Sequence, residues 1–519
     1  MAKKRKLTSK EFIAAIYNPN SETTFKDRFS LPWYTRFNVC MPIFFLITGL
    51  FIRLEGTLGG YFAMTFDQGK DLLALHSIVI DHKFTLIGSS AGIDGTFHGV
   101  WWYWFLSPFF YIFGGDPKLL LVVFGIFCAS AILVAYVLGA TLKNSRLGLI
   151  CAGLVTFSSF YIGTASQLWH PNAVTVFVLL FLWVFGRYLL SNGSFFWVGV
   201  FSGLIFEFQL AFGIFFIPSF ILALIINRSI PKIRDIGLGI GGCLLWMLPR
   251  FLFDLRHGFL QSRALLNFLL HPILRHTSLS LVARFQDRTE TFFNLFKNAF
   301  ARDNPFIAWG LLLIIVIFLI FYLRRESARL KKLVFIVVTQ IFLLFIITSL
   351  YPNVLWDYYL IGFPSLFLPI LGLSLYRFAQ VYKRVGWLLI LGLLFFNFSP
   401  QIYLNPTIWE GDASVYKNQI AVVDGIYKEA GVSEFNVSVY SPSVIDYTYQ
   451  YLFLWYGKAK YNYMPSRDKI KKTVFFIIEP DRWNPILKEA WLRDRNGDGT
   501  IVWQRRFAGG IEVEKRIRQ

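Results

Sequence analysis

The sequence predicts a polytopic α-helical membrane protein with a small C-terminal α/β domain. Of its 519 residues, 55% are hydrophobic and only 16% are charged, whereas a soluble domain carries about 25% charge. The hydrophobic residues occur in long blocks such as 119–142 and 308–323, and a membrane-spanning helix needs roughly 20 apolar residues. Near Asn405 the chain changes character, because polar and charged residues become frequent there.

The net charge of +20 favours contact with lipid headgroups over binding of nucleic acid, because Lys and Arg occur in short clusters between apolar blocks. The four cysteines lie in or beside apolar blocks without metal-ligand spacing, so we expect neither a metal site nor a disulfide framework. The first apolar block begins near Phe37 after a long polar stretch, so we expect no removable signal peptide.

Each apolar block is expected to form a helix, since a helix satisfies its own backbone in lipid. Eleven helices are expected, at 37–54, 118–142, 147–166, 172–190, 195–209, 211–227, 234–254, 305–323, 333–350, 357–376 and 386–402. The basic connections alternate with the others, and short basic connections belong in the cytoplasm. The basic connections are 3–6, 143–146, 228–234, 324–332 and 377–384.

This alternation divides the chain into three parts. Residues 1–36 form a cytoplasmic segment, 37–404 a transmembrane domain with outer loops 55–117 and 255–304, and 405–519 an extracytoplasmic domain. We expect a multi-pass protein of the plasma (inner) membrane. The aromatic-rich segment 100–113 is too short to span and would break the alternation, so it is predicted to be interfacial or re-entrant.

Residues 405–519 alternate between short β-like runs and helical stretches, which predicts a small α/β domain. The predicted strands are 435–440, 474–478, 501–507 and 510–517, and the predicted helices are 414–430, 446–456 and 485–492.

The first outer loop holds the string Thr65-Phe-Asp-Gln-Gly-Lys-Asp71. A carboxylate here, Asp67, is a candidate catalytic base that deprotonates an acceptor hydroxyl or amine. The alternative is that Asp67 caps a helix over 67–81. Asp71 lies one helical turn later and is a second catalytic candidate or a salt-bridge partner, and Lys70 is a candidate substrate-binding cation.

Two further strings on the predicted outer side carry histidine. His98 precedes the aromatic segment and either binds phosphate or shares a proton, or it occupies a turn. Trp169, His170 and Asn172 surround Pro171, which suits the first turn of a helix. We therefore expect either substrate contacts or capping from this second string.

Polar residues also interrupt the apolar helices near their outer ends. Glu207 and Gln209 are candidate substrate-binding groups at that depth, or they bond to a neighbouring helix. Arg250, Arg256 and Arg263 form a candidate phosphate site, since Arg holds phosphate bidentately, unless they snorkel to the interface.

Weaker candidates are Asp357 and Tyr358. The string 494–499 matches half of a calcium loop, but Arg505 stands where the bidentate Glu should be, so we expect a polar turn. The sequence contains no P-loop, dinucleotide fingerprint or zinc pattern. ATP-driven and redox chemistry therefore lack support, and no cofactor or metal is expected.

The order of these motifs carries a resemblance to a known family. After a basic N-terminus and one helix come 66–71 (Phe-Asp-Gln-Gly-Lys-Asp), 97–99 (Phe-His-Gly), the aromatic segment, 114–117 (Gly-Gly-Asp-Pro) and 169–172 (Trp-His-Pro-Asn). In this order the chain resembles bacterial membrane glycosyltransferases of family 39, which are related to protein O-mannosyltransferases and lipid A aminoarabinose transferases. The match covers the motifs up to residue 200 or so and, beyond it, the architecture alone.

The resemblance implies a GT-C fold and an inverting sugar transfer from a polyprenyl-phosphate donor, with Asp67 as the catalytic carboxylate. Several relatives have an acidic residue directly after this Asp, where this chain has Gln68. The expected partners are the lipid-linked donor, an acceptor protein, lipid or glycan, and membrane lipids.

Two other functions remain open at this point. A transporter or flippase would also use outer-facing charges, but it tends to show inverted repeats, and the sequence contains none. A protein that merely anchors the C-terminal domain would leave the polar outer loops without a role.

Overall fold

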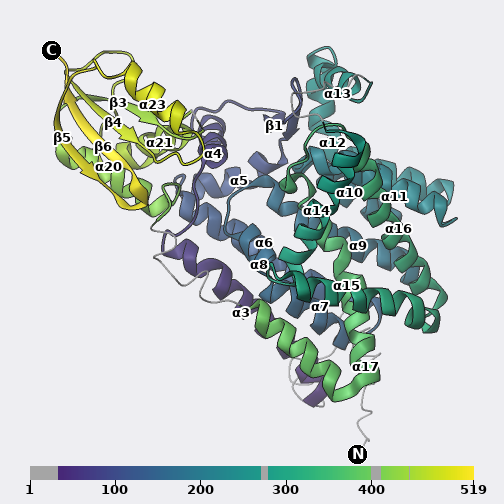
Figure 1. The fold of residues 1–519 in the computed structure, drawn as a ribbon. Helices are drawn as coiled ribbons and strands as arrows, with labels where there is room; N and C mark the ends of the chain where they lie inside the picture. The colour runs from purple at the N-terminus through teal and green to yellow at the C-terminus, as the bar shows by residue number, and fades with distance from the viewer. Residues whose placement is uncertain (1–32, 271–278, 399–410, 444) are drawn as a thin grey trace, which may run out of the picture.

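The computed structural model describes residues 33–270, 279–398, 411–443 and 445–519. Its ribbon shows a bundle of helices with an α/β domain at one end, and α4 (Phe66–Val79) lies where the two meet (Figure 1). The segment predicted to be cytoplasmic, 1–36, falls largely outside the described residues.

Within the described residues, each of the eleven predicted apolar segments falls mainly on helix, but the boundaries differ. The helices of the bundle are α3 (Trp33–Leu58), α6 (Pro117–Leu142), α7 (Ser145–Phe157), α8 (Ser159–Ala165), η1 (His170–Ala173), α9 (Val174–Ser191), α10 (Phe195–Phe208), α11 (Leu210–Ile226), α12 (Ile233–Arg256), α15 (Pro305–Ile317), η2 (Phe318–Tyr322), η3 (Leu323–Arg325), α16 (Ala328–Leu350) and α17 (Phe363–Asn397). Segment 147–166 is divided between α7 and α8, segment 305–323 between α15, η2 and η3, and the last two segments are joined in α17.

Among the described residues, 7 helices are long and apolar enough to cross a membrane, or up to 8 if α7 and α8, bent by 61°, form one span. Helices α10 and α11 are shorter apolar helices. Helix α17 joins the segments predicted as 357–376 and 386–402, with non-helical φ/ψ at Lys383. It starts six residues later than predicted because η4 (Asp357–Leu360) comes first, and residues 399–402 lie outside the described part of the chain.

Local sequence determines where several of these helices begin. The Asp116 side chain accepts a hydrogen bond from Lys118 N at 2.8 Å before α6, and Asn304 accepts one from Ile307 N at 3.1 Å before α15. Both caps are followed by proline at the start of the helix, where the missing N–H costs nothing.

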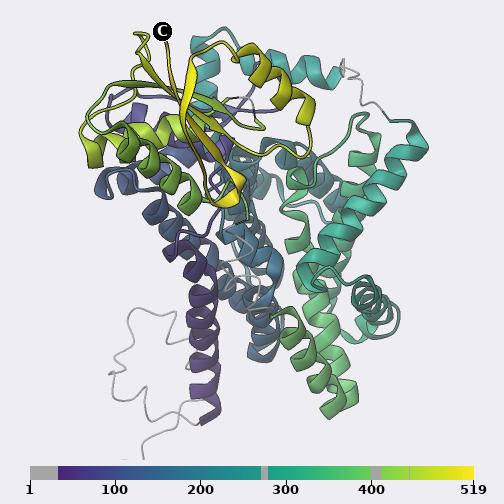
Figure 2. The ribbon, with the colours of Figure 1, turned by 60° about the vertical axis from the view of Figure 1, so that its left-hand side comes forward.

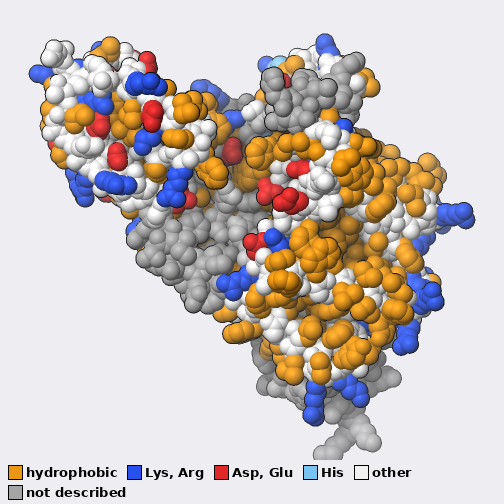
Figure 3. Space-filling view, viewed as in Figure 1, with side chains coloured by type: hydrophobic (Ala, Val, Ile, Leu, Met, Phe, Trp, Pro, Cys, Tyr) orange, Lys and Arg blue, Asp and Glu red, His pale blue; other side chains and the backbone are white. Residues whose placement is uncertain are grey.

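Hydrophobic side chains cover much of the visible face of the bundle (Figure 3). Large apolar residues of the bundle helices remain strongly exposed, including Ile233, Phe306 and Phe395. Such a surface is typical of helices that face lipid tails. The protein is therefore a multi-pass membrane protein.

The two long connections are structured. After α4 come the antiparallel strands β1 (Ile87–Ser90) and β2 (Phe97–Gly99), then α5 (Trp101–Ile112). At 12 residues α5 is too short to span a bilayer. The second connection holds α13 (Leu260–Leu270) and α14 (Leu281–Phe300), and α14 buries one face (Phe292, Phe296 and Phe300) as an amphipathic helix does.

The C-terminal α/β domain is confirmed. Its sheet has the order β3-β4-β6-β5, with β3 parallel to β4 and the other neighbours antiparallel. The elements are α20 (Tyr416–Ala430), β3 (Phe435–Tyr440), α21 (Tyr447–Leu452), η5 (Phe453–Gly457), α22 (Lys458–Tyr461), β4 (Thr473–Ile478), α23 (Pro485–Asp494), β5 (Thr500–Arg506), η6 (Ala508–Gly510) and β6 (Glu512–Ile517).

This domain packs on the start of α4, as the turned view also shows (Figure 2). Thr448 Oγ1 donates to Thr65 O at 2.9 Å, and Gln419 Nε2 donates to Met64 O at 3.1 Å. A side chain at Gly69 would clash with the backbone of Thr448, so glycine allows α21 to approach closely. The domain thus fixes the turn that carries Asp67.

Candidate active site

A cavity of about 330 Å³ lies beside α4, at the end of the bundle that carries the C-terminal domain. Five separate parts of the chain supply its walls: α4 with the β1–β2 hairpin, the α8–α9 junction, the start of α11, Phe268 of α13, and the segment before α17. Its lining includes Phe66, Asp67, Lys70, Asp71, Ser89, Ser90, His98, Trp169, His170, Gln209, Phe215, Tyr351, Tyr358 and Tyr359.

Asp67 belongs to the first turn of α4 and is exposed to the cavity. Within the described part of the chain, its carboxylate makes no hydrogen bond. Partial burial raises the pKa of Asp67 above its ordinary value, and the nearby Lys70 ammonium opposes that shift. A raised pKa improves a carboxylate as a proton acceptor near neutral pH.

The helix cap is Thr65 and not Asp67, because α4 begins one residue earlier than the predicted 67–81. Gln68 Oε1 accepts a hydrogen bond from Thr65 N at 2.9 Å, which is the return half of a capping box. This gives Gln68 a structural role and leaves the Asp67 carboxylate for the cavity.

Asp71 also lines the cavity but is 4% exposed and fully engaged. Its two oxygens accept hydrogen bonds from Trp102 Nε1 and Tyr103 Oη, each at 2.9 Å. Burial raises the pKa of Asp71 to about 7, while the two hydrogen bonds act to lower it. Asp71 therefore attaches α4 to the aromatic helix α5.

Among the described residues that line the cavity, Lys70 is the one Lys or Arg side chain. Its Nζ donates to Ser90 Oγ at 2.8 Å, which holds the ammonium against strand β1. Local sequence does not indicate this partner, because Ser90 lies twenty residues from Lys70 in the chain.

The structure brings His98 and His170 together, with ring centroids 4.2 Å apart. His170 Nδ1 contacts Phe208 O at 2.6 Å, whereas the buried His98 Nδ1 has no partner among the described residues. Burial lowers the pKa of His98 well below its ordinary value, and His170 and Arg250 add to this effect. His98 is thus held neutral in the cavity lining.

Trp169 and Gln209 converge on the same cavity. The rings of Trp169 and Tyr358 lie 5.0 Å apart, and Gln209 Nε2 donates to Tyr358 O at 3.1 Å. Gln209 Oε1 is buried without a partner in the described residues. Asn172 lies outside the lining, where its Nδ2 donates to Gln167 O at 3.1 Å.

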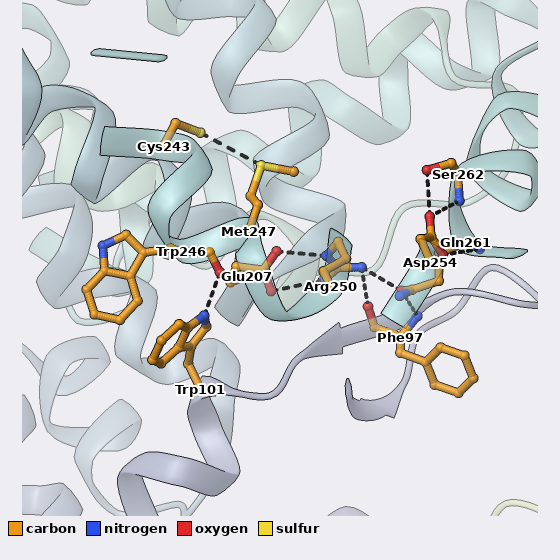
Figure 4. A network of polar contacts seen from close by, with 10 residues as sticks. All are labelled: Phe97, Trp101, Glu207, Cys243, Trp246, Met247, Arg250, Asp254, Gln261 and Ser262. Carbon is orange, nitrogen blue, oxygen red and sulfur yellow. Dashed lines mark hydrogen bonds and ion pairs between the residues drawn. The ribbon is translucent and has the colours of Figure 1, made fainter. Parts of the chain in front are cut away.

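Glu207 and Arg250 form a buried ion pair behind the cavity wall (Figure 4). Arg250 Nε lies 2.7 Å from Glu207 Oε1. The same guanidinium donates to Phe97 O at 2.8 Å and to Gln261 Oε1 at 2.7 Å. Arg250 therefore ties α10, β2 and α13 together and supports the strand that carries His98.

Arg256 and Arg263 are exposed and do not line the cavity. Arg263 donates to Gly258 O in its own turn. The three arginines predicted as one phosphate site are thus separated, because Arg250 points into the protein while the other two point out. Asp357 is exposed beside the cavity, and Tyr358 belongs to its wall.

Sequence reasoning missed several lining aromatics, of which Tyr351, Tyr359 and Phe215 are examples. The sequence feature that could have indicated Tyr351 and Tyr359 is the run of aromatic residues around Asp357, between two apolar helices. Among the described residues, no group of three His, Cys, Asp or Glu side chains is arranged to hold a metal ion.

No protein-family model and no curated protein matches this chain. Its structure is similar to that of ArnT from Cupriavidus metallidurans bound to undecaprenyl phosphate, with a TM-score of 0.59 and 10% identity over 94% of this chain and 98% of ArnT. It is also similar to ArnT from the same organism in the apo state, with a TM-score of 0.52 and 10% identity over 86% and 97%. ArnT is a lipid A aminoarabinose transferase. The chain therefore has the GT-C fold of membrane glycosyltransferases.

Proposed function

We propose that this protein is a membrane glycosyltransferase that takes a sugar from a polyprenyl-phosphate donor and transfers it, with inversion, to an acceptor protein, lipid or glycan. The observation that carries the proposal is the carboxylate of Asp67, which has no hydrogen-bond partner among the described residues and faces a cavity shared with Lys70, His98 and His170. A GT-C fold with a free carboxylate at this position suits direct displacement at a sugar carbon.

In this reaction Asp67 accepts the proton of an acceptor hydroxyl while that oxygen bonds to the anomeric carbon. The bond between the anomeric carbon and the phosphate oxygen breaks, and the polyprenyl phosphate departs with the bonding electron pair. The raised pKa of Asp67 supports its role as general base.

Lys70 is positioned to stabilise the departing phosphate, since it is a cation fixed by Ser90 on the cavity wall. The neutral His98, which lines the cavity, would hydrogen-bond to the sugar or the phosphate. The similar ArnT was crystallised with undecaprenyl phosphate, which supports a lipid-phosphate donor for this chain.

The charge distribution supports an orientation in the plasma (inner) membrane. Exposed basic residues include Arg228 in the turn after α11, Arg325 in the short η3 between α15 and α16, and Arg384 beside the break in α17 at Lys383. Basic residues between apolar segments are typically cytoplasmic. The cavity and the C-terminal domain would then face the extracytoplasmic side, where Asp67 meets the acceptor.

The test is sugar release from radiolabelled polyprenyl-phosphate hexoses and pentoses by the purified protein, with a membrane extract as acceptor source. We expect Asp67→Asn to lower the rate by about a hundredfold or more, the contribution of a general base. Asp81→Asn is the matched control, because Asp81 follows the same helix but lies outside the cavity lining. Equal release by wild type and a normally folded Asp67→Asn would remove Asp67 from the mechanism, and no release from any donor would contradict the transferase.

A further inference from the structure

A second, larger cavity of about 870 Å³ lies in the C-terminal domain. Its walls include the residues that follow the parallel strands β3 and β4, namely 441–443 and 479–483, together with the start of α20 and the start of α21. In α/β sheets, ligands bind in the crevice outside the carboxyl ends of parallel strands. The position of this cavity is therefore that of a ligand site.

Two buried polar side chains, Gln419 and Glu479, belong to the lining of this cavity. The Gln419 side chain is 2% exposed, and its Oε1 has no hydrogen-bond partner among the described residues. Glu479, just after the end of β4, is 8% exposed and is hydrogen-bonded to Tyr449 and Gln419. A buried acceptor left unpaired costs free energy, so a ligand that donates hydrogen bonds would stabilise this arrangement.

The remaining lining indicates the class of that ligand. Four carboxylates (Asp412, Asp446, Glu479 and Asp481) outnumber two arginines (Arg482 and Arg506) among the described residues of the lining, which disfavours an anion. Serine hydroxyls contribute further hydrogen-bonding groups. Trp483, which is 91% exposed, offers a flat apolar face at the rim. Hydroxyl donors combined with an apolar ring face are features of a neutral carbohydrate.

The two cavities share a wall. Phe66 lines both of them, and the next residue is Asp67. The domain is held against α4 by the hydrogen bond from Thr448 Oγ1 to Thr65 O and by the close packing of the Thr448 backbone on Gly69. A ligand held in the second cavity would therefore lie beside the candidate base.

We propose that this cavity binds a neutral carbohydrate through Glu479, Gln419 and Trp483 and is the site where a glycan acceptor is held. The assignment as acceptor site rests on the proposed transferase function. The binding itself does not, so the two can be tested separately.

The first experiment measures binding of maltotetraose, mannotetraose and the tetramer of N-acetylglucosamine to the full-length protein in detergent by saturation-transfer NMR and calorimetry. We expect at least one to bind with a Kd of about 1 mM or tighter, and Glu479→Gln and Trp483→Ala each to weaken that binding about tenfold. Trp483→Ala is included because the Trp483 side chain is exposed, so that its removal should leave the domain folded. Glu434→Gln is the control, because Glu434 lies on the surface of the same domain in an ion pair with Lys471.

No binding of any of the three oligosaccharides, unchanged binding by both variants, or binding of tetralysine or inorganic phosphate instead would overturn the proposal. Donor turnover without carbohydrate binding would reject this inference and leave the transferase. Carbohydrate binding that these variants weaken, without donor turnover, would reject the transferase and leave the binding site.

Discussion

The ring of His98 lies against the ring of His170, with centroids 4.2 Å apart. His98 comes from the short strand β2 in the first long connection, and His170 from the turn before α9. This contact joins two parts of the chain that are far apart in sequence, and both rings line the cavity.

We expect His98→Ala to lower the rate of sugar transfer about tenfold, because it removes one hydrogen-bonding group from the donor site. The measurement is kcat/KM with the labelled donor. His82→Asn serves as control, since His82 is exposed at a positive φ that Asn tolerates. An unchanged kcat/KM in His98→Ala would show that the histidine pair is only structural.

Lys70→Met should raise the KM for the lipid-phosphate donor about tenfold, through loss of a charge-assisted hydrogen bond. Arg256→Met and Arg263→Met should leave the KM unchanged, because both side chains are exposed away from the cavity. A raised KM in Arg256→Met and Arg263→Met, together with an unchanged KM in Lys70→Met, would instead support the phosphate site predicted from the sequence around Arg256.

The rate of transfer should fall as the pH decreases through the pKa of Asp67, since only the ionised carboxylate accepts a proton. Because burial raises this pKa, the decline should occur at a higher pH than for a free Asp side chain, whose pKa is about 3.9. A pH–rate profile of kcat/KM checks this expectation. A flat profile down to that value would exclude Asp67 as the base.

Asp71 should make stability depend on pH. Its pKa is raised from 3.8 to about 7 in the folded protein, so the folded state binds this proton more tightly than the unfolded chain does. Its contribution to the free energy of unfolding is therefore full below 3.8 and is lost as the pH rises toward 7. The thermal-unfolding advantage of wild type over Asp71→Asn, measured in detergent, should shrink over this range, and an advantage that stays constant would contradict the expectation.

Arg250→Met should destabilise the protein by about 3 kcal/mol or more, because it leaves the Glu207 carboxylate buried without its partner. The double variant Arg250→Met with Glu207→Gln should recover part of the loss. Arg256→Met, at the exposed end of the same helix, should change stability by about 0.5 kcal/mol or less. Thermal unfolding in detergent provides the comparison, and equal effects of Arg250→Met and Arg256→Met would refute the structural role of the pair.

The sequence by itself located the apolar segments and the strands of this protein. It did not show that 147–166 is bent between α7 and α8, or that the last two predicted segments are joined in α17. A helix in lipid must satisfy its own backbone, so the apolar blocks are sufficient to place it. Local signals such as Asp116-Pro117 mark where helices begin. In the C-terminal domain the alternation of apolar and polar residues placed all four strands to within two residues, as in 435–440.

Only the tertiary structure decided which polar residues act together. Trp169, His170 and Gln209 join Asp67 in one cavity because the ends of separate helices meet there, and no local pattern encodes that meeting. The fold also places Arg250 inward, against Glu207. A buried carboxylate without a partner destabilises the protein strongly, whereas an arginine at the surface contributes little.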